Sequence, residues 1–359
     1  MIMCGIDVHD NTLVTRIGIN KQKPTTKMVK NTLNGRFQLF KYLKNLSKES
    51  NEPKIVAAYE ASSIGFCIYD DCISAGIECH VLAPTKMRKS KKDMKQKNDV
   101  KDANLILEIL KAHLLAGNEL PSIWIPDDET RDDRELVRAR LNVVVKQTAV
   151  KTQIQTLLKR NKVVKDPEIG DAWTKSHRRW LDEIELPLGA RAALSSLLRQ
   201  LENIESEVKI LDKGITELSK TKRYKEPAKV LEETIKGVGL LTAMVFLTEM
   251  GDLSRFSNRK KVGAFLGLVP SSNESGEKND RKGHITRAGP SRVRSVLCQA
   301  TLSRISCDKK EHIYYWKIVD KNPKHKKIAV VACMRRLSIL MWHLALDAQQ
   351  KEDVFNKSA

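Results

Sequence analysis

The chain opens with MIMCGIDVHDNTLVTRIGIN, residues 1–20, in which two apolar runs flank a short polar stretch. The second run, TLVTRIGIN at residues 12–20, alternates apolar and polar residues with the period of two that is typical of a strand. A third run of this kind, TKMVKN, follows at residues 26–31. Because the connections between these runs are short, we expect three antiparallel strands.

The sequence up to about residue 118 then alternates helix and strand patterns. Strands are predicted in KIVAAYEA at residues 54–61 and in ECHVLAP at residues 78–84, and helices over about residues 35–46, over about residues 65–75 and from Asp99. Parallel neighbours in a sheet need helical crossovers, so residues 1–118 are predicted to form an α/β domain with a mixed sheet.

Strand patterns end near Pro121, and heptad spacing follows. Eight apolar residues between Leu194 and Leu218 recur at alternating steps of three and four, and a weaker row runs from Val143 to Leu157. We expect an α-helical coiled-coil segment over residues 119–228, in which these helices pair either with each other or with a second chain.

Residues 229–359 are predicted to form a mainly α-helical C-terminal domain. Gly237 and Gly239 in IKGVGLLTA indicate a helix-hairpin-helix-like turn. Such a turn either packs two helices together or offers backbone N–H groups to a phosphate.

The chain carries 64 Lys and Arg against 44 Asp and Glu, which gives a net charge of +20. This excess of positive charge indicates a nucleic-acid partner. The N-terminus lacks a signal-peptide layout and no apolar run approaches the roughly 20 residues of a spanning helix, so we expect a cytoplasmic protein with no membrane partner. The seven scattered cysteines are expected to be reduced.

Four carboxylates form the strongest chemical pattern. Asp7 and Glu60 end predicted strands, and Asp99 and Asp102 share one helix face. If the two strands are neighbours and the helix crosses their ends, the four carboxylates converge and repel one another unless a cation neutralises them. Mg²⁺ or Mn²⁺ fits such a site, and two ions about 3.5–4 Å apart clamp a phosphodiester. The alternative is structural, with Asp99 as a helix N-cap and Asp7 as a turn residue.

Basic residues beside these acids are expected to hold the nucleic-acid backbone; the main ones are Lys86, Arg88, Lys89, Lys91 and Lys92. A second polar loop, NESGEKNDRKGHITRAG at residues 273–289, contains Ser275 followed by Gly276. A serine hydroxyl needs a base, a metal ion or nearby positive charge to act as a nucleophile. Without such help, Ser-Gly is most often a turn.

Taken together and in this order, the segments resemble the DEDD transposases of the insertion-sequence-one-ten family. The segments that carry the resemblance are GIDVHD, YEASSIGF, NDVKDA, IKGVGLLTA, FLGLVPSSNESG and KGHITRAG, followed by Arg294. Arg287 stands where this family usually has Lys, and Pro290 follows Gly289. The charge at the first of these positions is kept.

The resemblance implies a RuvC-like N-terminal domain of the ribonuclease H fold, a coiled-coil connection and a C-terminal transposase domain. It implies that Asp7, Glu60, Asp99 and Asp102 hold Mg²⁺ or Mn²⁺, and that Ser275 is a nucleophile that forms a 5′-phosphoserine link to DNA. The residues expected to hold strands or charge are Gly237, Gly239, Lys278, Arg281, Lys282, Arg287 and Arg294.

The partners implied by the resemblance are donor and target DNA and a structured noncoding guide RNA. A homo-oligomer is also implied, a dimer or a tetramer in the synaptic complex, in which the acids of one subunit complete the site around the serine of another. Two other functions stay open: a metal-only nuclease of the Holliday-junction resolvase type, and a non-catalytic RNA-binding scaffold. An actin-like sugar kinase has the same kind of sheet, but the charge and the lack of a second glycine-rich loop argue against it.

Overall fold

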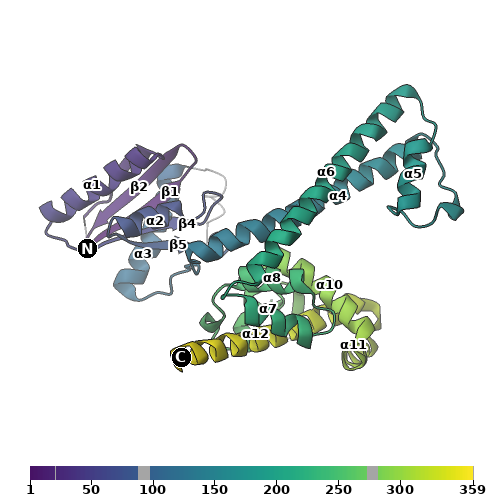
Figure 1. The fold of residues 1–359 in the computed structure, drawn as a ribbon. Helices are drawn as coiled ribbons and strands as arrows, with labels where there is room; N and C mark the ends of the chain where they lie inside the picture. The colour runs from purple at the N-terminus through teal and green to yellow at the C-terminus, as the bar shows by residue number, and fades with distance from the viewer. Residues whose placement is uncertain (21, 88–97, 273–281, 359) are drawn as a thin grey trace. The chain divides into compact units, whose positions relative to one another are not determined.

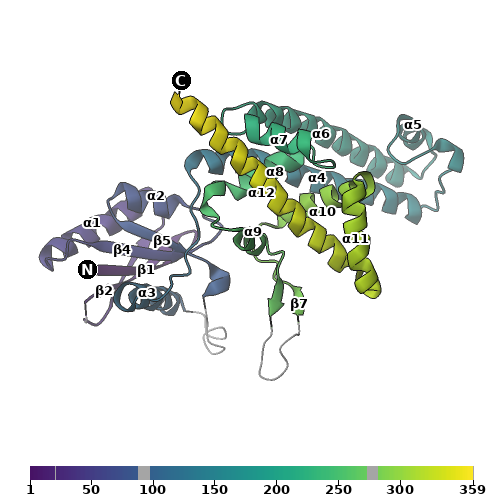
Figure 2. The ribbon, with the colours of Figure 1, turned by 90° about the horizontal axis from the view of Figure 1, so that it is seen from below.

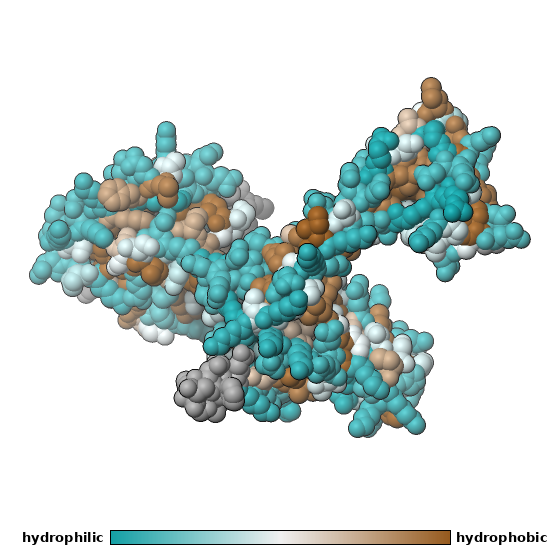
Figure 3. Space-filling view, in the orientation of Figure 1, coloured by the Kyte–Doolittle hydropathy of each residue, from teal (hydrophilic) through white to brown (hydrophobic). Residues whose placement is uncertain are grey.

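The computed structural model describes residues 1–20, 22–87, 98–272 and 282–358, without the side chains of Pro167, Ser272, Lys282 and residues 352–358. The chain divides into two compact units, Met1–Ile125 and Pro126–Ala359 (Figure 1). Most of the surface drawn in Figure 3 is hydrophilic, with apolar residues in scattered patches. The division into residues 1–118, 119–228 and 229–359 stays a prediction.

The N-terminal unit contains a five-stranded mixed sheet, as predicted. Its strands are β1 (Ile2–Val8), β2 (Thr12–Ile19), β3 (Thr25–Lys30), β4 (Ile55–Glu60) and β5 (Glu78–Leu82), in the order β3-β2-β1-β4-β5. The first three strands pair antiparallel, whereas β4 pairs parallel with both β1 and β5. The first and fourth strands are therefore neighbours, which was the condition for bringing Asp7 and Glu60 together.

The two faces of this sheet are covered by different helices. Ile2, Cys4 and Ile6 of β1 share a core with residues of α1 (Leu33–Glu49) and α2 (Cys67–Ser74). Met3 faces the other way and packs with Ile106, Leu107 and Leu110 of α3 (Asp99–Ala116). This alternation follows from the period of two along a strand.

Helix α3 lies directly on the backbone of β1. A Cβ atom at Gly5 would lie 2.3 Å from the carbonyl oxygen of Ala103 and 2.4 Å from the backbone nitrogen of Leu107. Only glycine permits this approach, so the sequence GID at the end of β1 fixes the N-terminal turn of α3 close to the same end of the strand.

The C-terminal unit begins with two long helices, α4 (Asp128–Arg160) and α6 (Leu188–Ser219), which pack against each other within the chain. Leu194, Leu201 and Ile215 of the heptad row are buried. Between the helices lie η2 (Pro167–Ile169) and α5 (Lys175–Glu183), whose Leu181 is buried with Val150 and Ile154 of α4. The structure thus places the two rows in one intramolecular pair, while coiled-coil geometry stays a prediction.

The rest of this unit is helical around one apolar core, apart from the hairpin β6–β7. The elements are α7 (Lys225–Thr234), α8 (Leu240–Met250), η3 (Leu253–Arg255), α9 (Arg259–Phe265), β6 (Pro270–Ser272), β7 (Lys282–Ile285), α10 (Ser291–Cys307), α11 (Lys309–Lys321), η4 (Pro323–His325) and α12 (Lys326–Ser358). Helix α8 is the centre of the core, because every residue from Ala243 to Met250 is buried. Figure 2 shows α12 running along the other helices.

One stretch in the described residues, Pro323–Lys351, is long and apolar enough to cross a membrane by length and composition, and its 18-residue apolar window has a mean hydropathy of 1.5. Its buried residues Met334, Leu337 and Met341 belong to the same core as α8. A core helix of a globular protein has the same length and composition, and 44% of the apolar window is buried inside the protein. All seven cysteines lie in the described residues and are free there, and their reduced state stays a prediction.

A buried ion pair joins α4 to α8. The carboxylate of Glu249, which is 5% exposed, accepts hydrogen bonds from Arg138 Nε at 2.7 Å and from a second guanidinium nitrogen at 2.9 Å. Arg134 donates to the backbone oxygens of Thr248 and Glu249 at 2.8 and 2.9 Å. Both arginines of α4 are thus held at the C-terminal end of α8.

We expect Glu249→Ala to destabilise the C-terminal unit by roughly 2–4 kcal/mol, because it leaves two partly buried guanidinium groups without their carboxylate. The value lies below that of a fully buried pair because the side chain of Arg138 is 32% exposed. Chemical denaturation followed by circular dichroism measures the change. The control is Glu217→Ala, which removes an exposed pair with Lys220 and should leave the unfolding curve nearly unchanged. Equal effects of the two variants would contradict the prediction.

Candidate active site

The ends of β1 and β4 place two carboxylates on the same face of the sheet. The final residue pair in the register of these parallel strands joins Ile6 and Tyr59, so the next position on each strand holds Asp7 and Glu60. Ile6 and Tyr59 face the core under α1 and α2. By alternation, Asp7 and Glu60 lie on the opposite face, the one that α3 covers.

The first turn of α3 supplies the other two carboxylates. The N-cap is Asn98, whose side-chain oxygen accepts a hydrogen bond from the backbone N–H of Val100 at 3.0 Å. The structural alternative for Asp99, a helix cap, is therefore wrong. Asp99 and Asp102 lie inside the first turn, where negative charge is favourable. Because Asp102 precedes Ala103, which contacts Gly5 of β1, this turn lies beside Asp7.

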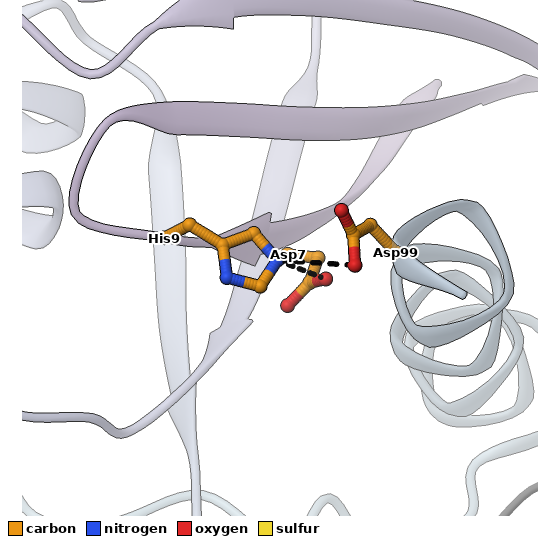
Figure 4. A group of neighbouring side chains, drawn as sticks. All are labelled: Asp7, His9 and Asp99. Atoms are coloured by element: carbon orange, nitrogen blue, oxygen red, sulfur yellow. Dashed lines mark hydrogen bonds and ion pairs between the residues drawn. The ribbon is translucent and has the colours of Figure 1, made fainter. Parts of the chain in front are cut away.

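His9 joins two of the carboxylates (Figure 4). Its Nε2 atom lies 3.1 Å from Asp7 Oδ2 and 3.3 Å from Asp99 Oδ1. One ligand atom from each of the three side chains lies within 4.8 Å of the others. The contacts place Nε2 between one oxygen of each carboxylate, where it is an N–H donor to both in one tautomer and a lone-pair ligand beside them in the other.

Sequence reasoning did not select His9. The available signal was its position two residues after Asp7 in GIDVHD, a spacing that keeps two side chains on one side of an extended segment. The turn after β1 preserves that arrangement, because the His9 backbone N–H donates to the Thr12 carbonyl oxygen at 2.9 Å.

The electrostatics of Asp7 indicate a site suited to a cation. Burial raises the pKa of the Asp7 carboxyl above its usual value, and the charges of Asp102 and Asp99 raise this pKa further, while His9 opposes the increase. Asp102 thus acts electrostatically on Asp7, as expected for carboxylates that share a site. The side chain of Asp7 is 16% exposed and that of Asp99 is 49% exposed, so the cluster is open to solvent on the side of α3.

The donor set fits a hard divalent ion. Carboxylate oxygens are the ligands that Mg²⁺ and Mn²⁺ take in proteins, and an imidazole nitrogen is compatible with Mn²⁺. In the described residues, direct contacts bring together Asp7, His9 and Asp99, while Asp102 is linked to them by its effect on the pKa of Asp7 and Glu60 by strand register.

The predicted basic contacts beside the acids are only partly described. Lys86 ends η1 (Pro84–Lys86) and is exposed. Arg88, Lys89, Lys91 and Lys92 lie outside the described residues. Their proposed role therefore stays a prediction.

The loop with the predicted nucleophile starts and ends at a two-stranded hairpin of the C-terminal unit (Figure 2). Strand β6 pairs antiparallel with β7, with Ser272 opposite Lys282. The positions of Ser275, Lys278 and Arg281 and the side chain of Lys282 lie outside the described part of the structure.

The segment after β7 is held tightly against the end of α9. Arg287 has a left-handed backbone with φ of 53°, and its N–H donates to the Gly267 carbonyl oxygen at 3.3 Å. Arg294 donates from one guanidinium nitrogen to the carbonyl oxygens of Leu266 and Gly289, at 3.1 and 3.0 Å. Arg294 therefore has a structural role here, and its predicted contact with DNA stays a prediction, as does that of the exposed Arg287.

The two glycines of the predicted phosphate turn differ in their surroundings. Gly237 has φ of +85°, and a Cβ there would lie 2.8 Å from the backbone nitrogen of Arg304 in α10. This close approach accounts for Gly237 by helix packing. Gly239 is the N-cap residue of α8 and is exposed, and a Cβ added to it would meet no described atom within 4 Å. Its phosphate contact stays a prediction.

We expect Gly289→Ala to destabilise the C-terminal unit by at least about 1–3 kcal/mol, because Gly289 has φ of +98°. A Cβ atom would also collide with the Phe265 carbonyl oxygen, so the backbone on both sides must shift. The thermal unfolding midpoint measures the effect. Gly189→Ala is the control, since a Cβ there meets no described atom within 4 Å and alanine favours the helix. An unchanged midpoint for Gly289→Ala would refute this account of the turn.

Comparison with known proteins extends over both units. A DEDD transposase family model matches residues 4–162, and a model of the transposase IS116/IS110/IS902 family matches residues 229–316. The putative transposase y4qE of Sinorhizobium fredii is 28% identical over 81% of this chain and 75% of its own length. The transposase for insertion sequence element IS1533 of Leptospira borgpetersenii is 26% identical over 74% of each chain.

Among solved structures, a Thermus thermophilus RuvC structure aligns with 34% of this chain and 99% of its own, at 12% identity and a TM-score of 0.25. The two family models span the acids at one end of the chain and the glycine turn and serine loop at the other. The chain belongs to the IS110 family of DEDD transposases.

Proposed function

We propose that this transposase is an RNA-guided DNA recombinase in which Ser275 attacks a DNA phosphate beside divalent metal held by Asp7, Glu60, Asp99 and Asp102. Membership of a transposase family makes the chain an enzyme that cuts and rejoins DNA. The observation that carries the metal site is the meeting of β1, β4 and the first turn of α3, with Asp7 and Asp99 both in contact with His9.

The acids of the N-terminal unit bind and orient the metal in this proposal. Mg²⁺ or Mn²⁺ would supply positive charge that activates the phosphate and stabilises the charge that develops on its oxygens. Asp7 is preorganised for this role, since partial burial and then its acidic neighbours disfavour its charged carboxylate without a cation. His9 orients Asp7 and Asp99 through its Nε2 atom.

The serine loop of the C-terminal unit supplies the nucleophile in this proposal. The Ser275 oxygen bonds to phosphorus and the DNA 3′-oxygen leaves, which produces a 5′-phosphoserine link; attack by a 3′-hydroxyl later reverses this step and joins new strands. Arg281, Lys282, Arg287 and Arg294 would bind the strands or the charge that develops. In a dimer or tetramer, acids of one subunit would complete the site around the serine of another.

A structured noncoding RNA is the proposed source of sequence specificity. Pairing of RNA with donor and target DNA leaves the protein to bind phosphates and helix shape, and this division of roles fits a net charge of +20. The basic residues from Lys86 to Lys92 and the turn at Gly239 are proposed contacts to these backbones.

The experiment that tests the mechanism is covalent trapping. Purified protein, the element-encoded RNA and end-labelled DNA are mixed with Mg²⁺, Mn²⁺ or EDTA, stopped in detergent and separated under denaturing conditions. We expect a protein–DNA adduct that requires both the metal and the RNA. Metal-dependent cutting without any adduct would instead favour the metal-only nuclease. RNA binding with neither cutting nor adducts, at any metal concentration, would favour the RNA-binding scaffold.

A further inference from the structure

Helix α11 and the start of α12 carry a group of exposed aromatic and basic residues in the C-terminal unit, which we call the α11 platform. Trp316 is 42% exposed and Ile313 is 59% exposed, and both lie on the same side of α11 as the exposed His312. The exposed lysines of the platform are Lys309, Lys310, Lys317, Lys321, Lys324, Lys326 and Lys327. None of these residues belongs to the metal site or to the serine loop.

The Trp316 ring is held by its neighbours while much of its surface stays open. Tyr315 meets it edge-on with ring centroids 5.6 Å apart, and the His312 ring lies 6.2 Å away. The Lys326 ammonium of α12 lies 5.8 Å from the Trp316 centroid. An indole that is fixed in place and exposed loses little conformational entropy when another flat ring stacks on it.

The helix beneath the platform is anchored to its neighbours. Glu311 of α11 is 2% exposed and lies between two arginines, with Oε2 at 3.4 Å from Arg304 of α10 and 3.9 Å from Arg336 of α12. Arg336 also lies over the Tyr314 ring, 4.5 Å from its centroid. Two helices, α10 and α12, thus hold α11 in place, so the platform is a preformed surface.

The charge of the platform selects a polyanion. Residues 309–327 contain seven lysines and two acids, Glu311 and Asp320, which gives a net charge of +5 from 7 minus 2. Glu311 is buried between its arginines, so of the two acids only Asp320 is exposed. Binding the phosphates of a nucleic-acid duplex would require only the lysines. The exposed indole among them adds a stacking surface, which a base can reach only when it is unpaired.

We propose that the α11 platform binds an unpaired DNA strand, with a base stacked on Trp316 and phosphates held by the surrounding lysines. DNA is the polyanion on which transposases act, and strand exchange leaves DNA unpaired while strands are open. This site goes beyond the metal and serine chemistry, and it requires neither. Its test is therefore run in EDTA, where loss of binding cannot come from the acidic cluster.

The test uses the full chain and a fluorescein-labelled oligothymidine of about 20 nucleotides, followed by anisotropy over a range of salt concentrations. Trp316→Ala is expected to weaken binding about 5- to 150-fold, from the ~1–3 kcal/mol of one stacked base. Trp316→Tyr should restore most of the affinity. The double variant Lys324→Ala/Lys327→Ala should reduce the slope of log affinity against log salt concentration by about one to two.

The matched controls lie on α6 of the same unit. Ile210→Ala removes an apolar side chain that is 59% exposed, and Lys209→Ala removes an exposed charge; both should leave affinity within about twofold. Circular dichroism of each variant verifies the fold. A second readout uses oligonucleotides with 5-iodouracil, which are crosslinked by light and mapped by mass spectrometry. We expect the crosslink on the peptide that contains Trp316.

Several results would overturn the proposal. These are an affinity of Trp316→Ala within twofold of the parent, a crosslink that maps only elsewhere, or an equal loss of duplex binding in Trp316→Ala. Tighter Trp316-dependent binding of the matching RNA, or of vesicles with anionic lipids, would assign the platform to that partner instead of to DNA.

Discussion

Replacing Asp7 by asparagine should abolish strand exchange, with a loss on the order of 10²-fold or more, while the protein stays folded. The metal is expected to contribute several kcal/mol to the stabilisation of charge at the phosphate, and the side chain of Asp7 is more buried than those of Asp99 and His9. Recombination between labelled donor and target DNA, with the element RNA and Mg²⁺ or Mn²⁺, measures the loss.

The same substitution should raise the stability of the metal-free protein at neutral pH. The folded-state pKa of Asp7 is raised, mainly by burial. A carboxyl of this kind favours the fold when protonated, and that contribution is lost as the pH rises through the raised pKa. Asparagine is neutral at every pH, so the gain in unfolding midpoint should be present at pH 7 and vanish below the ordinary pKa of aspartate. Added Mn²⁺ should then raise the midpoint of the parent but not of Asp7→Asn.

The control for Asp7→Asn is Glu108→Gln on α3. Glu108 is exposed and pairs with Lys111 of the same helix at 3.1 Å. This variant should keep full activity and the stabilisation by Mn²⁺. Full recombination by Asp7→Asn would disprove the metal site. If Asp7→Asn loses its fold together with its activity, the predicted rise of its unfolding midpoint at pH 7 is wrong.

Ser275→Ala should eliminate the covalent protein–DNA adduct and reduce recombination to background. The 5′-phosphoserine link requires this hydroxyl in the proposed mechanism, so the expected effect is complete rather than partial. Binding of the guide RNA and of DNA should stay within about twofold, because the hydroxyl contributes one hydrogen bond at most. Adducts are measured on denaturing gels and binding by gel shift, with the same preparations.

Ser272→Ala is the matched control for Ser275→Ala. Ser272 ends β6 in the hairpin that precedes the segment with Ser275, and its partner across the hairpin is Lys282. The control should form adducts at the parental level. An adduct that persists in Ser275→Ala would assign the nucleophile to another residue, and cutting without an adduct in the parent protein would favour water as the nucleophile.

The N-terminal sheet was predictable because its strands have local patterns. Apolar alternation in residues 12–20 and the buried run before Asp7 depend only on neighbours in the chain, and β1–β5 confirmed them. The adjacency of β1 and β4 was stated as a condition, since parallel pairing depends on residues about 50 positions apart. Gly5 was not singled out, although its contact with Ala103 places α3 on β1.

The sequence pointed to the four acids of the candidate site but not to its histidine, His9. Carboxylates at strand ends and at i and i+3 on a helix are readable from spacing, whereas the contact of His9 with Asp99 joins a turn to a helix 90 residues later. Asp99 and Asn98 both suit a helix cap, and only the geometry assigns that role to Asn98. The α11 platform was missed for a related reason, because exposure of Trp316 depends on how three helices pack.

The ion pairs between Glu249 and the arginines of α4 limit which segments can be exchanged between this protein and its relatives in a chimeric protein. If the helical hairpin of α4 and α6 made no specific contacts with the core, it could be exchanged between related transposases in a chimeric protein. Here Arg134 and Arg138 reach the last turn of α8, more than 100 residues later in the chain. A hairpin grafted from a relative should therefore fold only when α8 is transferred with it or when its acid and arginine positions match.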